Sequence, residues 1–177
     1  MKTAFLDVDT QLDFVNPSGA LYVPGAERVI PAVARLNAYA ANNGIPLVST
    51  VDAHAEDDIE FHTWPPHCVA GTLGQRKPAA TLVGQTIAEK QTVDAFQSPG
   101  AMEAIERTGA DHFVVYGVVT EICVLYAARG LLRLGKQVTL VTDAIAELHR
   151  ANAEKAIEEA CGGGAKLATA EEITRAR

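Results

Sequence analysis

The sequence predicts a three-layer α/β/α protein with a mostly parallel, doubly wound sheet. Short apolar runs typical of strands alternate along the chain with segments whose apolar spacing is typical of helices. One run, residues 112–116, is continuously apolar, as in strands buried on both faces. Strands separated by helices imply right-handed crossovers and helices on both faces of the sheet. No repeat or linker interrupts the 177 residues, so we expect residues 1–177 to form a single domain.

Six short runs predict the strands. The first, AFLDV, ends in acids, the second reads IPLVSTV, and the fourth, HFVVY, is followed by Gly117. Their β-branched and aromatic residues favour extended backbone, and polar or glycine residues bound them. The expected strands are residues 4–8, 45–51, 86–89, 112–116, 138–141 and 166–168.

Four segments predict helices. In residues 27–41 the apolar side chains recur every three to four positions, and Asn42-Asn43-Gly44 follows as a stop. Pro31 lies early enough in this helix to be tolerated. The expected helices are residues 27–41, 102–108, 121–134 and 151–160. Residues 53–80 show no sustained period, and an irregular segment of that length in a compact domain is usually functional or disordered.

Charge and hydropathy exclude several classes of partner. The net charge is -7 and the basic residues are scattered, which argues against nucleic-acid binding. No apolar run approaches the ~18 residues of a membrane span. Acidic residues Asp7, Asp9 and Asp13 near the N-terminus are unlike a signal peptide. We therefore expect a cytoplasmic protein that acts on a small molecule, with homo-oligomerisation left open.

The cysteines provide no disulfide framework or CxxC metal site, because Cys68, Cys123 and Cys161 are an odd number at wide spacing. Most cysteines are small buried hydrophobic residues. We expect Cys68 and Cys161 to be structural in this way. Cys123 has a different context.

Reactive side chains follow the expected strands. Asp9 follows the first strand, Asp52 and His54 the second, Lys90 the third, and Cys123 comes shortly after the fourth. The carboxyl ends of parallel strands lie at one edge of the sheet, where ligands bind. We expect these side chains to converge there.

Cys123 is expected in the first turn of its helix, after Thr120 as the N-cap. Unpaired N–H groups and the helix dipole favour the thiolate, so the thiol pKa should be lowered. Lys90 could stabilise negative charge, while Asp9 takes the thiol proton and returns it to the leaving amine. From spacing alone, a core cysteine beside two surface charges explains the pattern equally well.

Five motifs resemble those of the isochorismatase-like cysteine hydrolases, in the same order and at the same spacing. They are DTQLDF, DAH, WPPHCVAGT at residues 64–72, a lone Lys90, and GVVTEICV at residues 117–124. The resemblance implies the isochorismatase-like hydrolase fold and a catalytic triad of Asp9, Lys90 and Cys123. It also implies a cis peptide bond between Val118 and Val119, with the Val119 and Cys123 amides forming an oxyanion hole.

A metal site is implied by the same resemblance. Asp52, His54 and His67 supply carboxylate and imidazole in a D-x-H…H pattern, which suits one divalent ion: Zn²⁺ first, with Fe²⁺ or Mn²⁺ as alternatives. Glu60 is the first candidate for a fourth ligand and His62 the second. Taken singly, either His54 or His67 could be an ordinary loop histidine.

WPPHC and the metal motif are closest to the nicotinamidases, in which the metal holds the pyridine nitrogen of the substrate. Phe14 and Trp64 would then be aromatic walls of the pocket, although core or lid packing is the alternative. Two residues depart from the nicotinamidase pattern, because Ala53 and Ile122 stand where aromatic residues are common. These departures concern the substrate and leave the nucleophile in place.

The resemblance therefore implies a metal-assisted amidohydrolase that converts nicotinamide to nicotinate and ammonia through a Cys123 thioester, a step of NAD salvage. One alternative is another small amide, ureide or carbamoyl substrate on the same triad. A second is a non-catalytic binding or scaffold domain. A third, isochorismate ether cleavage, is disfavoured because the family pattern for that reaction replaces the cysteine.

Overall fold

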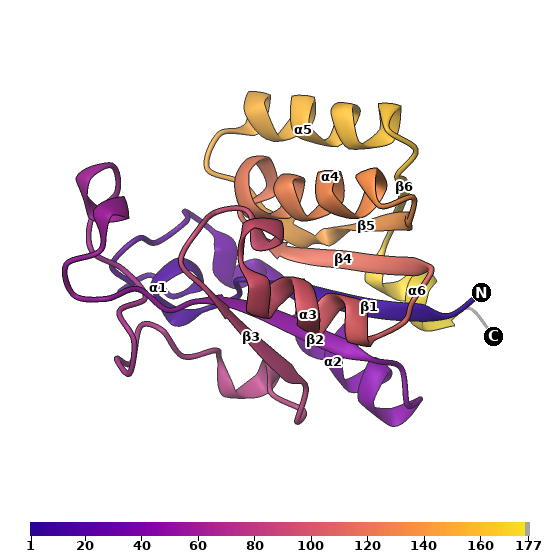
Figure 1. Ribbon diagram of the computed structural model, residues 1–177, viewed down its shortest axis with the longest axis horizontal. Coiled ribbons are helices and arrows are strands. Elements are labelled where there is room, and N and C mark those ends of the chain that lie inside the picture. Colours follow the sequence, from indigo (N-terminus) through magenta and orange to yellow (C-terminus); the bar gives the residue numbers. More distant parts are fainter. Residues whose placement is uncertain (176–177) are drawn as a thin grey trace.

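A computed structural model describes residues 1–175 and contains a six-stranded sheet (Figure 1). Neighbouring strands pair in parallel in the order β3-β2-β1-β4-β5-β6. The strands are β1 (Thr3–Val8), β2 (Leu47–Asp52), β3 (Thr86–Lys90), β4 (His112–Val118), β5 (Gln137–Ala146) and β6 (Lys166–Ala168). The parallel sheet confirms the predicted fold class.

Helices cover both faces of this sheet. The α-helices are α1 (Leu12–Val15), α2 (Ile30–Asn42), α3 (Pro99–Arg107), α4 (Leu125–Arg133), α5 (Arg150–Gly162) and α6 (Ala170–Arg175). Helices α3, α4 and α5 lie on one face, and α2 and α6 lie together on the other (Figure 1). The molecule therefore has the three expected layers.

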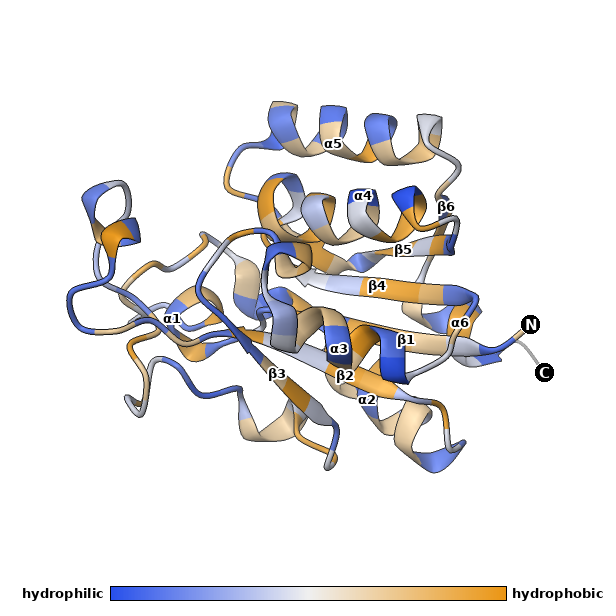
Figure 2. Cartoon of the chain, viewed as in Figure 1, coloured by the Kyte–Doolittle hydropathy of each residue, from blue (hydrophilic) through white to orange (hydrophobic). Residues whose placement is uncertain are grey.

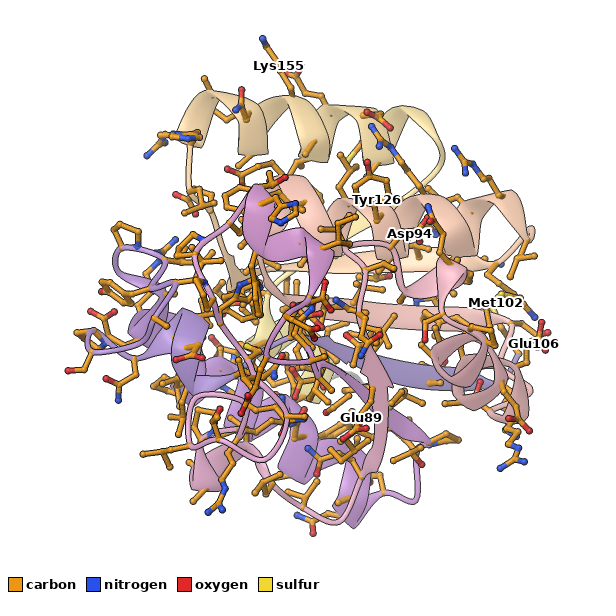
Figure 3. All side chains as sticks on the ribbon, turned by 60° about the vertical axis from the view of Figure 1, so that its left-hand side comes forward. Glu89, Asp94, Met102, Glu106, Tyr126 and Lys155 are labelled. Carbon is orange, nitrogen blue, oxygen red and sulfur yellow. The ribbon has the colours of Figure 1, made fainter. Side chains whose placement is uncertain are left out.

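The hydrophobic core lies between the layers. Strand β4 is continuously buried from Phe113 to its end, and β1 from Ala4, as expected for strands covered on both faces. Figure 2 shows hydrophilic residues on the outer side of α5, and Figure 3 shows Lys155 pointing away from the body of the molecule. Within residues 1–175, no helix is long and apolar enough to cross a membrane.

Two predicted helices begin differently from the prediction. The segment expected as one helix at 27–41 starts as a 3₁₀ turn, Ala26–Val29, and α2 begins at Ile30 with Pro31 in its first turn. This places the proline where its missing N–H removes no helical hydrogen bond. The helix expected from residue 121 starts with a π-helical turn, Thr120–Val124, before α4. Two further short helices, α1 and α6, were not expected.

The order of the strands reverses at β1, which lies between β2 and β4. In doubly wound sheets such a switch point leaves a crevice at the carboxyl ends of the strands. Gly117 closes the contact between β1 and β4: its φ is 123°, and a Cβ there would lie 2.0 Å from the Val8 carbonyl oxygen. Only glycine fits, and the chain that leads to Cys123 thus passes directly beside the end of β1.

Candidate active site

Asp9 lies just beyond the end of β1 and is fully buried. Its φ is +50°, a left-handed conformation that aspartate tolerates better than most residues. Its N–H donates to the Thr50 carbonyl at 3.1 Å, and its Oδ1 accepts from the Thr50 hydroxyl at 2.7 Å. Burial and the nearby Asp52 carboxylate raise the pKa of Asp9, while Lys90 opposes the rise. The result is a fixed carboxylate with an increased affinity for a proton.

Lys90 is the last residue of β3 and is buried, with its ammonium group directed at two carboxylates. Its Nζ lies 2.8 Å from Asp9 Oδ2 and also forms a close ion pair with Asp52 Oδ1. Burial alone would lower the pKa of Lys90, but these acids outweigh it and hold the pKa well above its usual value. Lys90 therefore stays charged between the two aspartates.

Cys123 lies in the π-helical turn after β4 and is 9% exposed. Both Asp9 and Lys90 lie close enough to its thiol to influence it electrostatically. Burial raises the pKa of this thiol well above its usual value; Lys90 opposes that rise, and Asp9 adds to it. The expected lowering of the Cys123 pKa is therefore wrong. The physical reason is desolvation, which outweighs the charge of Lys90.

Thr120 does not cap the helix as expected. The N-cap residue is Val119, and the buried Thr120 hydroxyl has no hydrogen-bond partner in the part of the chain that the structure describes. The preceding peptide bond, between Val118 and Val119, is cis. Both valines line the same pocket as the Cys123 side chain.

Three buried residues form a group that could hold a metal ion: Asp52 at the end of β2, and His54 and His67 in the segment that follows. Their ligand atoms lie within 4.8 Å of one another. His54 Nε2 is 3.9 Å from Asp52 Oδ2, and His67 Nε2 is 4.0 Å from the same oxygen. These distances exceed hydrogen-bond length, so the donor atoms surround a common point without bonding to one another.

The His54 ring supports this interpretation. Its Nε2 is buried and has no hydrogen-bond partner among residues 1–175, an arrangement that is costly unless another group is bound there. Burial lowers the pKa of His54, but the carboxylates of Asp52 and Asp58 outweigh it and raise the pKa to about 9. The site thus favours positive charge, and its imidazole and carboxylate donors fit a first-row divalent ion.

The two candidates for a fourth ligand differ in position. Glu60 Oε2 lies 3.9 Å from His54 Nε2, and Glu60 lines the same pocket as Asp52 and His67. His62 is exposed and belongs to neither of the metal-type clusters found among the described residues. The geometry therefore favours Glu60 over His62.

Asp52 joins the triad to the metal-type cluster, which sequence reasoning had not shown. One of its oxygens pairs with Lys90, and the other faces the two histidines. The buried Gln11 side chain makes two hydrogen bonds to the Asp52 backbone: its Nε2 donates to the Asp52 carbonyl at 2.8 Å, and its Oε1 accepts from the Asp52 N–H at 2.7 Å. Gln11 stands in the DTQLDF motif, but its partner could not be read from the sequence.

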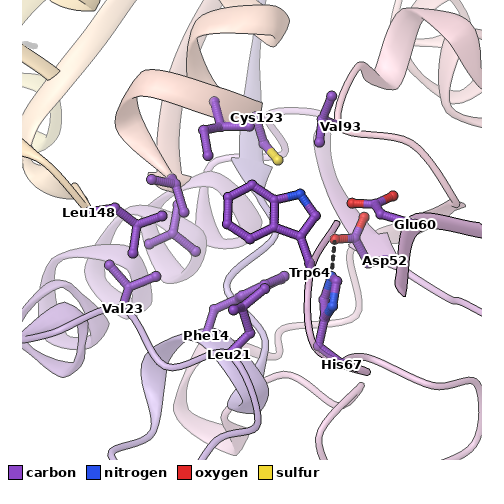
Figure 4. A pocket seen from close by; sticks show the side chains of 13 residues that line it. Phe14, Leu21, Val23, Asp52, Glu60, Trp64, His67, Val93, Cys123 and Leu148 are labelled. Carbon is purple, nitrogen blue, oxygen red and sulfur yellow. Dashed lines mark ion pairs between the residues drawn. The ribbon is translucent and has the colours of Figure 1, made fainter. Parts of the chain in front are cut away.

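A mainly apolar pocket opens over these groups and encloses about 440 Å³, including its open mouth. Figure 4 shows the Cys123 sulfur on one side of the pocket and Asp52, Glu60 and His67 on the other. Phe14 and Trp64 both line it, and the Phe14 ring centroid lies 5.4 Å from that of His67. Ile122, which the sequence had marked as a departure that concerns the substrate, also lines the pocket. The sequence did not indicate the remaining lining residues, which are Leu21, Val23, Val93 and Leu148.

The other two cysteines differ from each other. Cys68 is buried in the core beside His67, and its N–H donates to Asp13 at 2.7 Å. Cys161 is exposed near the end of α5, so the expectation that it is a buried structural residue is wrong. It occupies the outer side of the last helical turn, which residue type alone does not reveal.

Comparisons with known proteins identify the family and the fold. A family model described as the isochorismatase domain matches residues 3–172. The nicotinamidase/pyrazinamidase of Mycobacterium tuberculosis is 27% identical over 175 residues, covering 88% of this chain and 92% of that protein. The pyrazinamidase of Pyrococcus horikoshii, solved in complex with zinc, is 30% identical with a TM-score of 0.88, covering 96% and 99% of the two chains.

Another solved structure, N-carbamoylsarcosine amidase from Thermoplasma acidophilum, is 25% identical with a TM-score of 0.87, covering 98% of this chain and 99% of that one. The match of the family model spans nearly the whole sequence, and the two structural matches cover 96% and 98% of this chain. This chain belongs to the isochorismatase family.

Proposed function

We propose that this protein is a metal-assisted cysteine amidohydrolase that converts nicotinamide to nicotinate and ammonia. Its family and its relatives make it a hydrolase acting on amide C–N bonds. One observation carries the finer proposal: a single pocket is lined by the Cys123 side chain and by Asp52, Glu60 and His67 of the metal-type cluster. A small aromatic amide can reach both at once.

The triad supplies the covalent chemistry. Cys123 Sγ attacks the carbonyl carbon while its proton passes to Asp9, the neighbouring carboxylate. The tetrahedral oxyanion then collapses, the C–N bond breaks, and Asp9 returns the proton so that ammonia leaves. Water attacks the resulting thioester, gives a proton to Asp9, and releases the acid with the thiol restored.

Two further groups stabilise the negative charge that develops. The amides of Val119 and Cys123 lie at the turn beside the sulfur and would receive the oxyanion. Lys90, charged and 2.8 Å from Asp9, keeps Asp9 able to release its proton to the leaving amine. Because burial raises the pKa of the Cys123 thiol, we assign Asp9 the role of accepting its proton during the attack.

Asp52, His54, His67 and Glu60 would hold one divalent ion, of which Zn²⁺ is the first choice and Fe²⁺ and Mn²⁺ are alternatives. When bound, the ion would supply a Lewis acid that coordinates the pyridine nitrogen of the substrate. Phe14 and Trp64 would sandwich the ring and exclude water from the reacting carbonyl. The chain's own groups thereby orient the carboxamide toward Cys123.

A second candidate stays within the family: a carbamoyl or ureide substrate. The likeness to N-carbamoylsarcosine amidase favours it. So does Ile122, which lines the pocket at a position where nicotinamidases often carry an aromatic residue. The triad would act on such a substrate in the same way.

Measuring ammonia release from nicotinamide, from benzamide and from a carbamoyl compound distinguishes the two candidate functions. Benzamide keeps the ring and carboxamide but lacks the ring nitrogen, so a site built around that nitrogen should turn it over far more slowly. We expect nicotinamide hydrolysis that is lost on chelation and restored by Zn²⁺ or Mn²⁺. Equal hydrolysis of both amides by metal-free protein would contradict the proposal. Ammonia from a carbamoyl compound alone would favour the second candidate.

A further inference from the structure

Asp58 contacts two residues of the candidate metal site, His54 and Glu60, although no motif drew attention to it. It precedes the 3₁₀ turn Ile59–His62, which carries Glu60. One carboxylate oxygen, Oδ2, is 2.9 Å from His54 Nδ1, and the other, Oδ1, accepts the Glu60 N–H at 2.9 Å. A single side chain therefore contacts two of the four candidate ligand residues.

The contact with His54 decides which ring nitrogen faces the cluster. With Nδ1 bonded to Asp58, the opposite nitrogen, Nε2, points at Asp52 Oδ2 and Glu60 Oε2, each 3.9 Å away. In the neutral ring that a metal ion binds, a proton on Nδ1 leaves the Nε2 lone pair available, and a carboxylate partner makes the imidazole a better metal ligand. Asp58 thus sets both the orientation of the ring and the identity of its donor atom.

The second histidine is held differently. His67 Nδ1 lies 2.8 Å from the Pro65 carbonyl oxygen, a backbone group that no side-chain substitution removes. The cap of Asp58 on the Glu60 amide likewise fixes the start of the turn that presents the Glu60 carboxylate. The positions of His54 and Glu60 therefore depend on the side chain of Asp58, which a substitution can remove.

We propose that Asp58 is a positioning residue of the metal site, which orients His54 and holds the turn carrying Glu60 for a first-row divalent ion. This inference rests on the metal role proposed above. It assigns Asp58 no contact with substrate. Its loss should weaken metal binding while leaving the covalent chemistry of Cys123 intact once the site is filled.

The test measures the affinity of the full chain for Zn²⁺ by competition with a chromogenic chelator. Asp58→Ala should raise the Zn²⁺ Kd about 10–100-fold, the usual effect of removing the partner of a ligating histidine. Asp58→Asn can still cap the turn but, in doing so, turns its amide group toward His54, so it should also weaken binding by about 10-fold or more. Asp57→Ala is the matched control, because the substitution removes the same charge from an exposed neighbour that is not hydrogen-bonded to His54 or Glu60.

Two further readouts separate positioning from a general structural effect. In Zn²⁺-loaded protein, the His54 Nδ1 proton should be seen by nuclear magnetic resonance in slow exchange with water, and it should exchange rapidly in Asp58→Ala. Alkylation of Cys123 by iodoacetamide should proceed at the wild-type rate in all variants. Wild-type Zn²⁺ affinity in Asp58→Ala, or equal weakening by Asp57→Ala, would overturn the proposal.

The test also distinguishes this inference from the proposed activity. If wild-type protein binds Zn²⁺ but does not hydrolyse nicotinamide, the substrate is wrong, and the variants still decide the role of Asp58. If wild-type protein binds neither Zn²⁺ nor Mn²⁺, both ideas are overturned.

Discussion

Lys77 and Asp7 form a buried ion pair on the opposite side of β1 from the candidate triad, and its removal offers a quantitative test of the packing. Lys77 Nζ lies 2.9 Å from Asp7 Oδ2, and both side chains are almost fully buried. Asp7 also accepts hydrogen bonds from Thr10 at 2.7 Å, Asn37 at 2.8 Å and Ser49 at 3.1 Å. The pair connects β1 to the long segment that carries His67.

Lys77→Met keeps most of the side-chain volume and leaves the Asp7 carboxylate buried without its cation. Breaking a buried pair on one side costs about 3–5 kcal/mol. The three remaining donors to Asp7 still solvate its charge, so we expect the lower end, about 3 kcal/mol, in the free energy of unfolding. Urea unfolding followed by far-ultraviolet circular dichroism measures this loss.

Two variants control the prediction. Arg107→Met breaks the exposed pair with Glu103, whose side chains are 77% and 62% exposed, and should cost no more than about 0.5 kcal/mol. Adding Asp7→Asn to Lys77→Met removes the stranded charge, so the double variant should be more stable than Lys77→Met alone. Equal losses of unfolding free energy for Lys77→Met and Arg107→Met, or a double variant less stable than Lys77→Met, would show that an unpaired Asp7 charge is not the cause.

Three other predictions follow from named contacts. Gln11→Met leaves the buried N–H and carbonyl of Asp52 unpaired, so it should lower the free energy of unfolding by about 2 kcal/mol or more and weaken Zn²⁺ binding; unchanged chelator competition would contradict it. Burial, together with the charge of Lys166, lowers the pKa of His112 in the folded protein. In the unfolded chain this histidine has a pKa of about 6.5 and so binds a proton more readily, and the free energy of unfolding should therefore fall as the pH drops below that value. His112→Gln should flatten this slope in urea titrations from pH 7 to 5, and an unchanged slope would exclude His112. Cys123→Ala should abolish ammonia release while keeping the wild-type unfolding midpoint, and residual turnover above a few per cent would remove Cys123 from the nucleophile's role.

The strands and their carboxyl-edge residues were predictable from the sequence because the relevant signals are local. A continuous apolar run predicts a buried strand, and the parallel arrangement then brings Asp9, Lys90 and the residues after β4 to one edge. Gly117 was read only as the end of a strand, whereas the structure shows that it permits close contact with Val8.

Tertiary contacts account for what sequence reasoning missed or had wrong. The raised pKa of Cys123 comes from burial by distant parts of the chain, whereas a helix-start argument considers only local dipoles. The π-helical turn replaces the ordinary N-cap at Thr120, and neither residue type nor spacing distinguishes these turns. Gln11 and Asp58 contact candidate ligand residues through side-chain hydrogen bonds that no motif spacing reveals.

A thioester on Cys123 can be trapped by adding hydroxylamine during nicotinamide hydrolysis by the Zn²⁺-loaded protein. Hydroxylamine attacks a thioester faster than water does and converts the acyl group to nicotinohydroxamate. If the thioester forms, hydroxamate should appear at the expense of nicotinate, with ammonia release undiminished. Ammonia accompanied by nicotinate alone, at every hydroxylamine concentration, would show that water attacks the amide directly and that no thioester forms on Cys123.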